Sequence, residues 1–466
     1  MLPVEFINRI RSQGYIDAEA LLKGLSEPSP VSIRINSQKW RKIPVNADPV
    51  PWSRTGFYLD KRPSYTLDPL FHSGCYYPQE ASSMYIEQAV RQASGTLENV
   101  RVLDLCGAPG GKSTHLSDII GPDNLLVTNE VIRSRASILA ETITKWGSSN
   151  TIVTQNDPYA FGRLSGYFDL ILVDAPCSGE GMFRTNTAVK EWSVENAAHC
   201  SERQKRIIMD IWPSLKENGI LIYSTCTFNP GENENNIKWL ITKHEAETVR
   251  LNTGDFNGIT EIDYNGIYGY GFYPGKIKGE GFFISVIRKK GKQEKMTVRN
   301  QRLSELKPGK ADLEMAKNWS DFAEERILKW GDEVFAVHIN MDDYLNLFRN
   351  LRVIKKGTKI FNIKKSDYLP SHDLALSNKM RKGVFNKEDI GLAEAVSYLR
   401  RENFTFNNRS KGWTIVVYKG INLGFAKNLG NRVNNYYPVE WRIKMSMPEP
   451  GRMNIIKWDD DDKTIP

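Results

Sequence analysis

Two cysteines that directly follow predicted strands are the residues best suited to covalent chemistry. The run Leu172-Val-Asp-Ala-Pro-Cys177 ends one apolar stretch, and Tyr223-Ser-Thr-Cys226 ends another. If both strands lie in one parallel sheet, their carboxyl ends open on the same crevice and the two thiols face it together. A nearby positive charge would lower a thiol pKa and make the thiolate a nucleophile. The pair therefore predicts nucleophilic catalysis, whereas a single buried cysteine is more often a small hydrophobic residue.

A glycine-rich segment, Asp104-Leu-Cys-Gly-Ala-Pro-Gly-Gly-Lys112, follows an earlier apolar run and precedes a helical pattern. Its glycines allow a tight turn and a close approach of the backbone to a ligand. Two interpretations compete: a nucleoside-cofactor loop at the end of the first strand, and a phosphate-binding loop of the type G-x-x-x-x-G-K-[ST]. Cys106 stands where the phosphate-binding pattern requires glycine. The spacing therefore favours the nucleoside cofactor.

Acidic residues end three successive predicted strands: Asp104, Glu130 and Asp157. Glu130 is placed to accept hydrogen bonds from both ribose hydroxyls of a cofactor, and Asp157 could accept one from an adenine amino group. Such a series suits an adenosine without phosphates and a cationic sulfonium, which favours S-adenosylmethionine (S-adenosyl-L-methionine) over NAD. The alternative is that these carboxylates only cap helices.

Thiols, a methyl donor and an acid together suit one reaction. C5 of cytosine is a poor nucleophile, but thiolate addition at C6 makes C5 enamine-like and able to attack a methyl group. The adduct must then lose the C5 proton and the enzyme sulfur, a step that a second thiol could assist. Asp174, just before Pro176-Cys177, could hydrogen-bond an amide-like edge of the base.

The elements that must position these residues alternate along residues 76–290. Short apolar runs are separated by amphipathic helical stretches, which predicts a mostly parallel, doubly wound α/β sheet. We expect helices such as 133–145 and 195–211. The strands are expected at 100–105, 125–130, 151–157, 168–174, 220–225 and 282–288.

Four units are expected along the chain. Residues 1–75 form an N-terminal α+β lead-in, and 76–290 form the cofactor-binding sheet. The basic, glycine-containing stretch 288–295 is the expected linker to a separate mixed α/β unit at 300–385. A strand-rich unit follows at 405–458, and the acidic tail 459–462 is expected to be a solvated end.

The composition excludes several classes of protein. The chain has 466 residues, 40% of them hydrophobic and 25% charged, which rules out global disorder, collagen and coiled coil. No apolar run is long enough to span a bilayer, and the start lacks the apolar core of a signal peptide, so a cytoplasmic location is expected. A net charge of +8 permits a polyanionic partner without requiring one. Five cysteines without a C-x-x-C pair predict neither a disulfide framework nor a metal site.

At this level of detail the chain resembles a known family, the Nop/Sun RNA cytosine-C5 methyltransferases. The resemblance covers about residues 30–290, and its motifs appear in the family's order. They are Gly74-x-Tyr-Tyr-Pro-Gln-Glu-Ala-Ser-Ser-Met84, the glycine-rich segment ending at Lys112, Asp174-Ala-Pro-Cys177, Arg203-Gln204, Ser224-Thr-Cys-Thr-Phe-Asn-Pro-x-Glu-Asn-Glu234 and Gly279-Glu-Gly-Phe-Phe283.

The resemblance implies a Rossmann-like S-adenosylmethionine-dependent methyltransferase sheet. It implies that Cys226 is the nucleophile, that Cys177 releases the product, and that Asp174 and Lys112 lie beside the target base and the methyl donor. Arg135 is a plausible extra contact with cofactor or RNA. Gly107 departs from the family, which more often has alanine there, and we expect it only to loosen the loop. The implied cofactor contacts are Cys106, Gly107, Ala108, Pro109, Gly110, Gly111, Lys112, Glu130, Arg135, Asp157 and Asp174.

Within the family, Gly179-Glu-Gly-Met-Phe-Arg184 and the long C-terminal extension look like the bacterial branch that modifies small-subunit ribosomal RNA. In that branch the extension holds an intermediate domain and a PUA-like RNA-binding domain, which the segment 412–438 resembles. The resemblance implies an RNA partner, ribosomal RNA or the small ribosomal subunit, no membrane, and a monomer, and the lead-in 1–75 is expected to bind RNA. Trp413 and Tyr436 could stack on bases. Five lysines form a basic edge: Lys355, Lys356, Lys359, Lys364 and Lys365. This edge could contact the phosphates of the RNA backbone, or it could be only a solvated face.

Other functions remain open from the sequence. A transfer RNA cytosine-C5 methyltransferase would use the same chemistry on another substrate. A DNA cytosine-C5 methyltransferase would use the thiol of Cys177 as the nucleophile and would not need Cys226. An RNA-binding ribosome assembly factor without catalysis would keep only the fold, and the intact cysteine pair argues against it.

Overall fold

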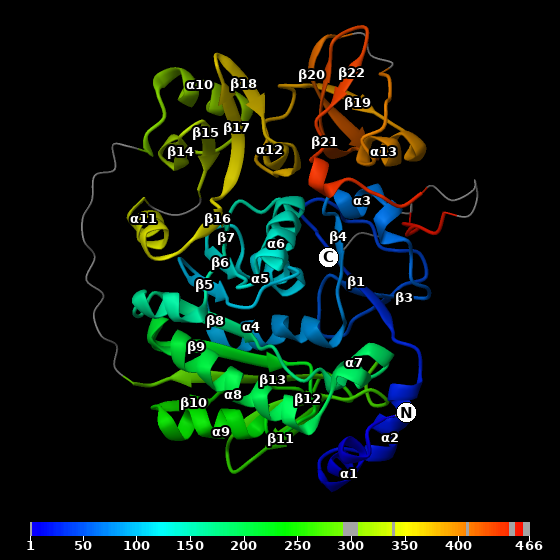
Figure 1. The fold of residues 1–466 in the computed structure, drawn as a ribbon, viewed down its shortest axis with the longest axis vertical. Helices are drawn as coiled ribbons and strands as arrows, with labels where there is room; N and C mark the ends of the chain where they lie inside the picture. The colour runs from blue at the N-terminus through cyan, green and yellow to red at the C-terminus, as the bar shows by residue number, and fades with distance from the viewer. Residues whose placement is uncertain (1, 292–305, 338–340, 407–409, 447–452, 460–466) are drawn as a thin grey trace.

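A single large sheet forms the centre of the molecule (Figure 1). The computed structural model describes residues 2–291, 306–337, 341–406, 410–446 and 453–459. The central sheet has ten strands in the order β11-β12-β13-β9-β8-β5-β6-β7-β16, and β10 also pairs with β13. β5 to β9 run parallel, whereas β13 joins β9 and β16 joins β7 in the antiparallel direction. The strands are β5 Arg101–Asp104, β6 Leu125–Asn129, β7 Thr151–Thr154, β8 Phe168–Asp174, β9 Leu215–Thr225, β10 Ala246–Thr248, β11 Thr260–Asp263, β12 Tyr268–Phe272, β13 Phe282–Lys289 and β16 Val353–Lys355.

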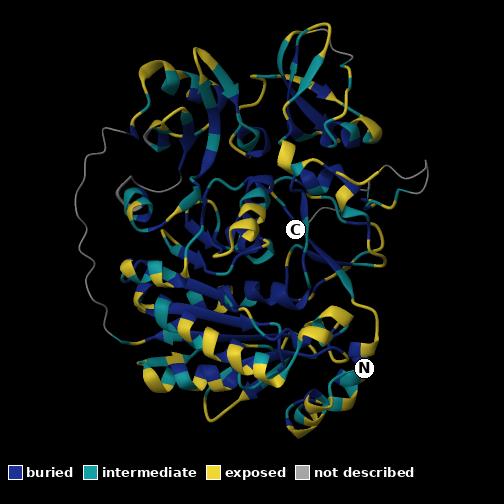
Figure 2. Ribbon diagram, viewed as in Figure 1, coloured by how far each residue is buried: buried dark blue, intermediate teal, exposed yellow. Residues whose placement is uncertain are grey.

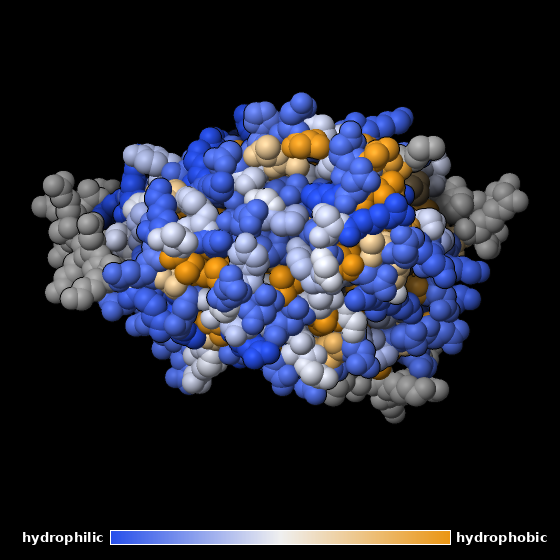
Figure 3. Space-filling view, turned by 90° about the horizontal axis from the view of Figure 1, so that it is seen from below, coloured by the Kyte–Doolittle hydropathy of each residue, from blue (hydrophilic) through white to orange (hydrophobic). Residues whose placement is uncertain are grey.

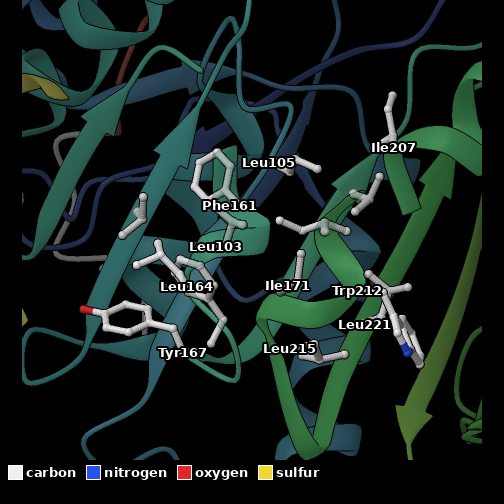
Figure 4. Packing of buried hydrophobic residues seen from close by; sticks show 14 of the residues in the cluster. Leu103, Leu105, Phe161, Leu164, Tyr167, Ile171, Ile207, Trp212, Leu215 and Leu221 are labelled. Carbon is white, nitrogen blue, oxygen red and sulfur yellow. The ribbon is translucent and has the colours of Figure 1, made fainter. Parts of the chain in front are cut away.

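Helices bury both faces of this sheet. In β8, Leu170 and Leu172 pack in one hydrophobic cluster with α4 (Ile86–Ser94) and α5 (Gly111–Ile120). The alternate residues Ile171 and Val173 pack in a second cluster with α8 (Val194–Ile211) and α9 (Glu234–Lys243). Figure 4 shows part of the second cluster. A parallel sheet buried on both faces requires continuous apolar strands, and for this reason the sequence reveals it.

The expected doubly wound sheet is confirmed, and the differences lie mainly at strand ends. β7 ends at Thr154 rather than at 157, because Asp157 already caps a following 3-10 helix, η3 (Pro158–Arg163). β9 begins at Leu215 rather than at 220. α6 (Arg133–Trp146) and α8 lie where helices are expected. The strands β10, β11 and β12 were not expected.

The N-terminal lead-in contacts two distant parts of the molecule. Its helix α1 packs through Phe6 against Phe183 and Phe228 of the central unit. Its sheet, in the order β2-β3-β1-β4, shares a hydrophobic cluster with the C-terminal unit, so these two ends of the chain lie side by side (Figure 1). The lead-in elements are α1 Val4–Ser12, α2 Ala18–Ser26, β1 Val31–Ile35, β2 Asp48–Pro49, β3 Gly56–Leu59, α3 Pro69–His72 and β4 Tyr76–Pro78.

The C-terminal part forms two four-stranded sheets, β14-β15-β17-β18 and β19-β20-β21-β22. The expectation that 300–385 is a separate unit is wrong in one respect: β16 lies within that stretch but pairs with β7, where it covers the backbone groups of an edge strand. The fourth sheet begins at β19, upstream of the expected start at 405. The elements are α10 Lys310–Trp319, β14 Ile327–Trp330, β15 Glu333–Ala336, α11 Met341–Asn350, β17 Thr358–Lys364, β18 Asp367–Pro370, α12 His372–Leu376, β19 Asn386–Asp389, α13 Leu392–Leu399, β20 Gly412–Tyr418, β21 Ile421–Asn428 and β22 Val433–Asn435.

Two predicted segments fall partly outside the described residues. β13 extends through Lys289 into the expected linker 288–295, and the linker beyond residue 291 lies outside the described residues. The acidic tail beyond Asp459 also lies outside them.

The surface of the described residues is mainly polar. Exposed residues gather on the outer sides of helices such as α6 and α8, whereas the central strands are mostly buried (Figure 2). The face seen from below carries mostly hydrophilic residues with scattered hydrophobic patches (Figure 3). Within the described ranges, none of the helices combines the length and the hydrophobicity needed to cross a bilayer.

Candidate active site

A cavity of about 350 Å³ opens where β5, β8 and β9 end. The loop after β5, from Cys106 to Lys112, forms one wall, and Asp174 and Cys226 from the two neighbouring strand ends form another. The lead-in segment 77–83 and the segment 280–282 before and at the start of β13 complete the lining. This is the edge at which parallel α/β sheets bind ligands.

The two predicted cysteines lie against each other at this edge. The Sγ atoms of Cys177 and Cys226 are 3.1 Å apart, and the backbone N–H of Cys226 donates to Cys177 Sγ at 3.3 Å. Cys226 lines the cavity, whereas Cys177 is not one of its lining residues. The hydrogen bond with Cys226, together with burial, raises the pKa of the Cys177 thiol well above its usual value. The two thiols therefore share one hydrogen bond at the ends of β8 and β9.

Lys112 and Asp174 form an ion pair in the cavity wall. Lys112 Nζ lies 3.0 Å from Asp174 Oδ2, and Ser224 Oγ donates to Asp174 Oδ1 at 2.8 Å. Burial alone would lower the pKa of Lys112, but the Asp174 carboxylate outweighs it and the net shift is upward. Lys112 is therefore a fixed ammonium in the cavity that the Cys226 thiol also lines.

The glycines of the cofactor loop are needed for close packing. A Cβ at Gly107 would lie 2.2 Å from Thr128 Oγ1 and 2.6 Å from Ser113 Oγ. Gly110 has a φ of 118°, a conformation that favours glycine. The expectation that Gly107 only loosens the loop is therefore wrong, because in this chain the hydroxyls of Thr128 and Ser113 fill the space that an alanine methyl would take.

Four predicted cofactor residues lie outside the cavity lining: Gly110, Glu130, Arg135 and Asp157. Glu130 is buried and accepts from the backbone N–H of Ile132 at 3.0 Å, while its other oxygen lies 3.4 Å from Arg135. Arg135 donates to the backbone oxygen of Ala108 at 2.9 Å, so it supports the loop from outside. Asp157 is exposed and caps η3 by accepting from Tyr159 N at 3.1 Å, as the helix-capping alternative predicts.

The residues present fit a cationic cofactor such as S-adenosylmethionine. Asp104 is fully buried beneath the loop; its Oδ2 accepts from Ser113 Oγ at 2.6 Å, and its Oδ1 has no partner among the described residues. Burial raises the pKa of Asp104 to about 7. The cavity lining itself carries three carboxylates, of Glu80, Asp174 and Glu280, against the single ammonium of Lys112. An acidic cradle of this kind suits a sulfonium and an ammonium group better than a pyrophosphate.

Two loops that carry the cysteines are braced from the N-terminal helix. Glu180 is fully buried; its Oε1 accepts from Arg9 of α1 at 2.5 Å and its Oε2 accepts from the backbone N–H of Phe228 at 3.1 Å. Arg9 also donates to the backbone oxygen of Phe228 at 3.1 Å. Gly181 N donates to the backbone oxygen of Cys226 at 2.8 Å. The lead-in therefore fixes the strand end that carries Cys226.

The expected RNA contacts are partly engaged within the protein. Lys355 pairs with Asp373 at 2.5 Å, and Lys356 and Lys359 pair with Glu333 at 2.8 and 2.6 Å. The remaining two lysines of the basic edge, Lys364 and Lys365, are exposed. In the fourth sheet, the rings of Trp413 and Tyr436 pack edge to face with centroids 4.5 Å apart, and Tyr436 stays 39% exposed.

With this geometry in place, the fold and the site define the protein as a methyltransferase. It belongs to the RsmB/F methyltransferase family: the model described as 16S rRNA methyltransferase RsmB/F matches residues 95–288. The N-terminal domain model of 16S rRNA methyltransferase RsmF matches residues 2–81, and the RsmF PUA domain model matches residues 385–443. The last match starts near β19, as the fourth sheet does.

Relatives match nearly the whole chain. A protein of Shewanella piezotolerans named ribosomal RNA small subunit methyltransferase F is 28% identical over 93% of this chain and 96% of its own. A protein of Aliivibrio salmonicida with the same name is 29% identical over 94% and 97%. A methyltransferase homologue of Pyrococcus horikoshii is 27% identical, with a TM-score of 0.50 over 62% of this chain and 100% of its own. The crystal structure of PH0851, 20% identical with a TM-score of 0.56 over 62% of this chain and 66% of its own, shares the fold.

Sequence reasoning gave no role to several residues that line the cavity. Glu80, Glu280 and Phe282 all fall in motifs that carry the family resemblance, so their place in those motifs was an available signal. Tyr77 packs so closely over Gly111 that a Cβ there would lie 2.9 Å from its ring. Lys112 Nζ lies 5.6 Å from the centroid of the Phe282 ring.

Proposed function

We propose that this protein methylates C5 of cytosine in RNA through a covalent bond between Cys226 and C6 of the base. The observation that carries the proposal is the pair of thiols 3.1 Å apart, of which Cys226 lines the same cavity as the Lys112–Asp174 ion pair. S-adenosylmethionine, bound along the glycine-rich loop, would supply an electrophilic methyl group.

Each side chain takes a definite part in this reaction. Cys226 faces the cavity and adds to C6 as a thiolate, and the Lys112 ammonium lines the same cavity. Asp174 holds the base through its amino edge. After methyl transfer, Cys177, whose Sγ lies 3.1 Å from that of Cys226, assists the removal of the C5 proton; the electron pair of the C5–H bond re-forms the C5–C6 double bond and the Cys226–C6 bond breaks to release the product.

The names of the relatives support a substrate class. Both relatives named above carry small-subunit ribosomal RNA in their names, and they align over nearly their full length. We therefore infer that the target lies in small-subunit ribosomal RNA. A target in transfer RNA would show as methylation of that RNA instead, and bisulfite sequencing of RNA from cells with and without the gene separates the two.

Substitution of each cysteine tests the mechanism. Cys226→Ala should abolish methyl transfer, while Cys177→Ala should still form the covalent bond and leave protein trapped on RNA. The trapped complex is measured by denaturing gel electrophoresis with labelled RNA. If Cys226→Ala kept full activity, or if Cys177 proved to be the attacking thiol, the assigned roles would be wrong and the pattern would be that of a DNA cytosine methyltransferase.

A further inference from the structure

A buried carboxylate joins the two cysteine loops. Glu232, which is fully buried, follows Cys226 in the loop after β9. Its Oε2 accepts from the backbone N–H of Ser178 at 2.9 Å, and its Oε1 accepts from the Ser178 hydroxyl. The same hydroxyl lies 3.0 Å from Thr227 Oγ1. Because Ser178 follows Cys177 and Thr227 follows Cys226, these contacts connect the residues next to both thiols.

Gln204 of α8 holds the other side of Cys177. Its Nε2 donates to Glu232 Oε2 at 2.9 Å and to the backbone oxygen of Pro176 at 3.0 Å. Gln204 is itself oriented by Asn236, whose Nδ2 donates to Gln204 Oε1 at 2.8 Å. The residues before and after Cys177 are therefore both tied to one carboxylate.

Glu232 is held by hydrogen bonds rather than by an ion pair. Three donors converge on its two oxygens, from the Ser178 backbone, the Ser178 hydroxyl and the Gln204 amide. No lysine or arginine pairs with it among the residues that the structure describes. Such a buried carboxylate is costly unless its acceptors are used, and here they are used to fix two loops.

We propose that Glu232 is a positioning residue that sets the separation of the Cys177 and Cys226 thiols through Ser178 and Gln204. It touches neither the cavity nor the reacting atoms. Its effect on catalysis rests on the proposed function, but its effect on the thiol separation does not.

Thiol–disulfide exchange with glutathione measures that separation without RNA or methyl donor. One thiolate attacks oxidised glutathione and releases one reduced glutathione. The second thiolate attacks the mixed disulfide and releases another. The products are a Cys177–Cys226 disulfide and two reduced glutathiones. The sulfurs, 3.1 Å apart at rest, must approach to about 2.05 Å. Peptide mapping identifies the pair among the five cysteines.

Glu232→Gln keeps the shape of the side chain but places an amide donor among three donors. We expect its exchange equilibrium to shift toward the dithiol by roughly tenfold or more, because the added donor weakens the contacts that hold the two cysteine loops together. A tenfold shift corresponds to about 30 mV. The matched control is Glu234→Gln, two residues along, which is also buried but bonds to Tyr15 instead. The control should stay within about twofold of the natural protein, since it contacts neither cysteine loop.

A second variant guards against misfolding. Ser178→Ala removes only the hydroxyl and leaves the Ser178 backbone N–H bonded to Glu232, so we expect a smaller shift in the same direction and a smaller loss of thermal midpoint than in Glu232→Gln. An unchanged equilibrium in Ser178→Ala, or equal shifts in Glu232→Gln and Glu234→Gln, would overturn the proposal. If instead exchange behaves as expected while neither cysteine supports methylation, the proposed function fails and the positioning role stands.

Discussion

Arg34 of β1 connects the lead-in to the helix that follows the cofactor loop. Its substitution should show most clearly how the lead-in affects that loop. Its side chain is fully buried. It lies 2.6 Å from Asp118 of α5 and donates to Gln79 Oε1 at 2.9 Å and to Thr114 Oγ1 at 2.5 Å. Its guanidinium also lies 4.4 Å from the centroid of the Trp146 ring. Because α5 begins at Gly111, these contacts hold the first turn of the helix that carries Lys112.

Arg34→Met should cost about 3 kcal/mol of unfolding free energy. Breaking a buried ion pair costs roughly 3–5 kcal/mol. We take the lower end because Asp118 keeps 27% of its side chain exposed to solvent. The control is Arg91→Met, which removes an ion pair of Glu87 from a side chain that is 37% exposed and should cost at most about 1 kcal/mol.

Two assays distinguish positioning from stability alone. Urea unfolding gives the free-energy loss, and equilibrium binding of S-adenosylmethionine to the folded protein gives the effect on the loop, which we expect to be on the order of tenfold weaker. Equal losses for Arg34→Met and Arg91→Met would refute the energetic reasoning. A destabilised Arg34→Met with normal methyl-donor affinity would refute the positioning of the loop.

Three other changes test separate parts of the site. Gly107→Ala should cost about 1–3 kcal/mol through overpacking against Thr128, and Thr128→Ala in the same chain should restore part of it, which a double-mutant cycle of thermal midpoints measures. Arg9→Met leaves the Glu180 carboxylate buried without its cation and should lower turnover by loosening the loop of Cys226, with methyl-donor affinity unchanged in a binding assay. Because the pKa of Asp104 in the folded protein is raised from 3.8 to about 7, the stability present at low pH falls as pH rises between these two values. Asp104→Asn should therefore flatten the pH dependence of the unfolding midpoint in that window, and an unchanged slope would contradict the raised pKa.

The sequence predicts the centre of this fold well because its signals are local. Apolar strands such as 168–174 and the glycine-rich loop can each be recognised from one continuous stretch of sequence. The parallel topology then brings the ends of β8 and β9 together. The convergence of Cys177 and Cys226 follows from that topology alone. Contacts between distant segments carry no such signal. The pairing of β16 with β7, and of Lys356 with Glu333, joins residues that no periodicity connects.

The acids at strand ends illustrate the same limit. Asp104, Glu130 and Asp157 are equivalent in sequence position, yet Asp104 is buried beneath the loop, Glu130 bonds to the backbone of Ile132, and Asp157 caps η3. Whether a carboxylate serves a ligand or its own backbone depends on where the next few residues turn. The geometry of the turn after each strand decides which of these partners the carboxylate has. The alternation of apolar and polar residues does not encode that geometry.

The lead-in supports the catalytic site from two sides, which gives it a part beyond the RNA binding expected of it. Arg9 of α1 holds the loops of the two cysteines through Glu180, and Arg34 of β1 holds the helix of the cofactor loop through Asp118. Both ion pairs are substantially buried. Neither the cysteine loops nor the helix of the cofactor loop can therefore move away from the lead-in without leaving an unpaired charge away from water. In the proposed reaction the Cys226 thiol and the methyl donor must meet at a fixed distance. A lead-in that holds both sides of the site would therefore convert binding of the two substrates into alignment of the reacting atoms.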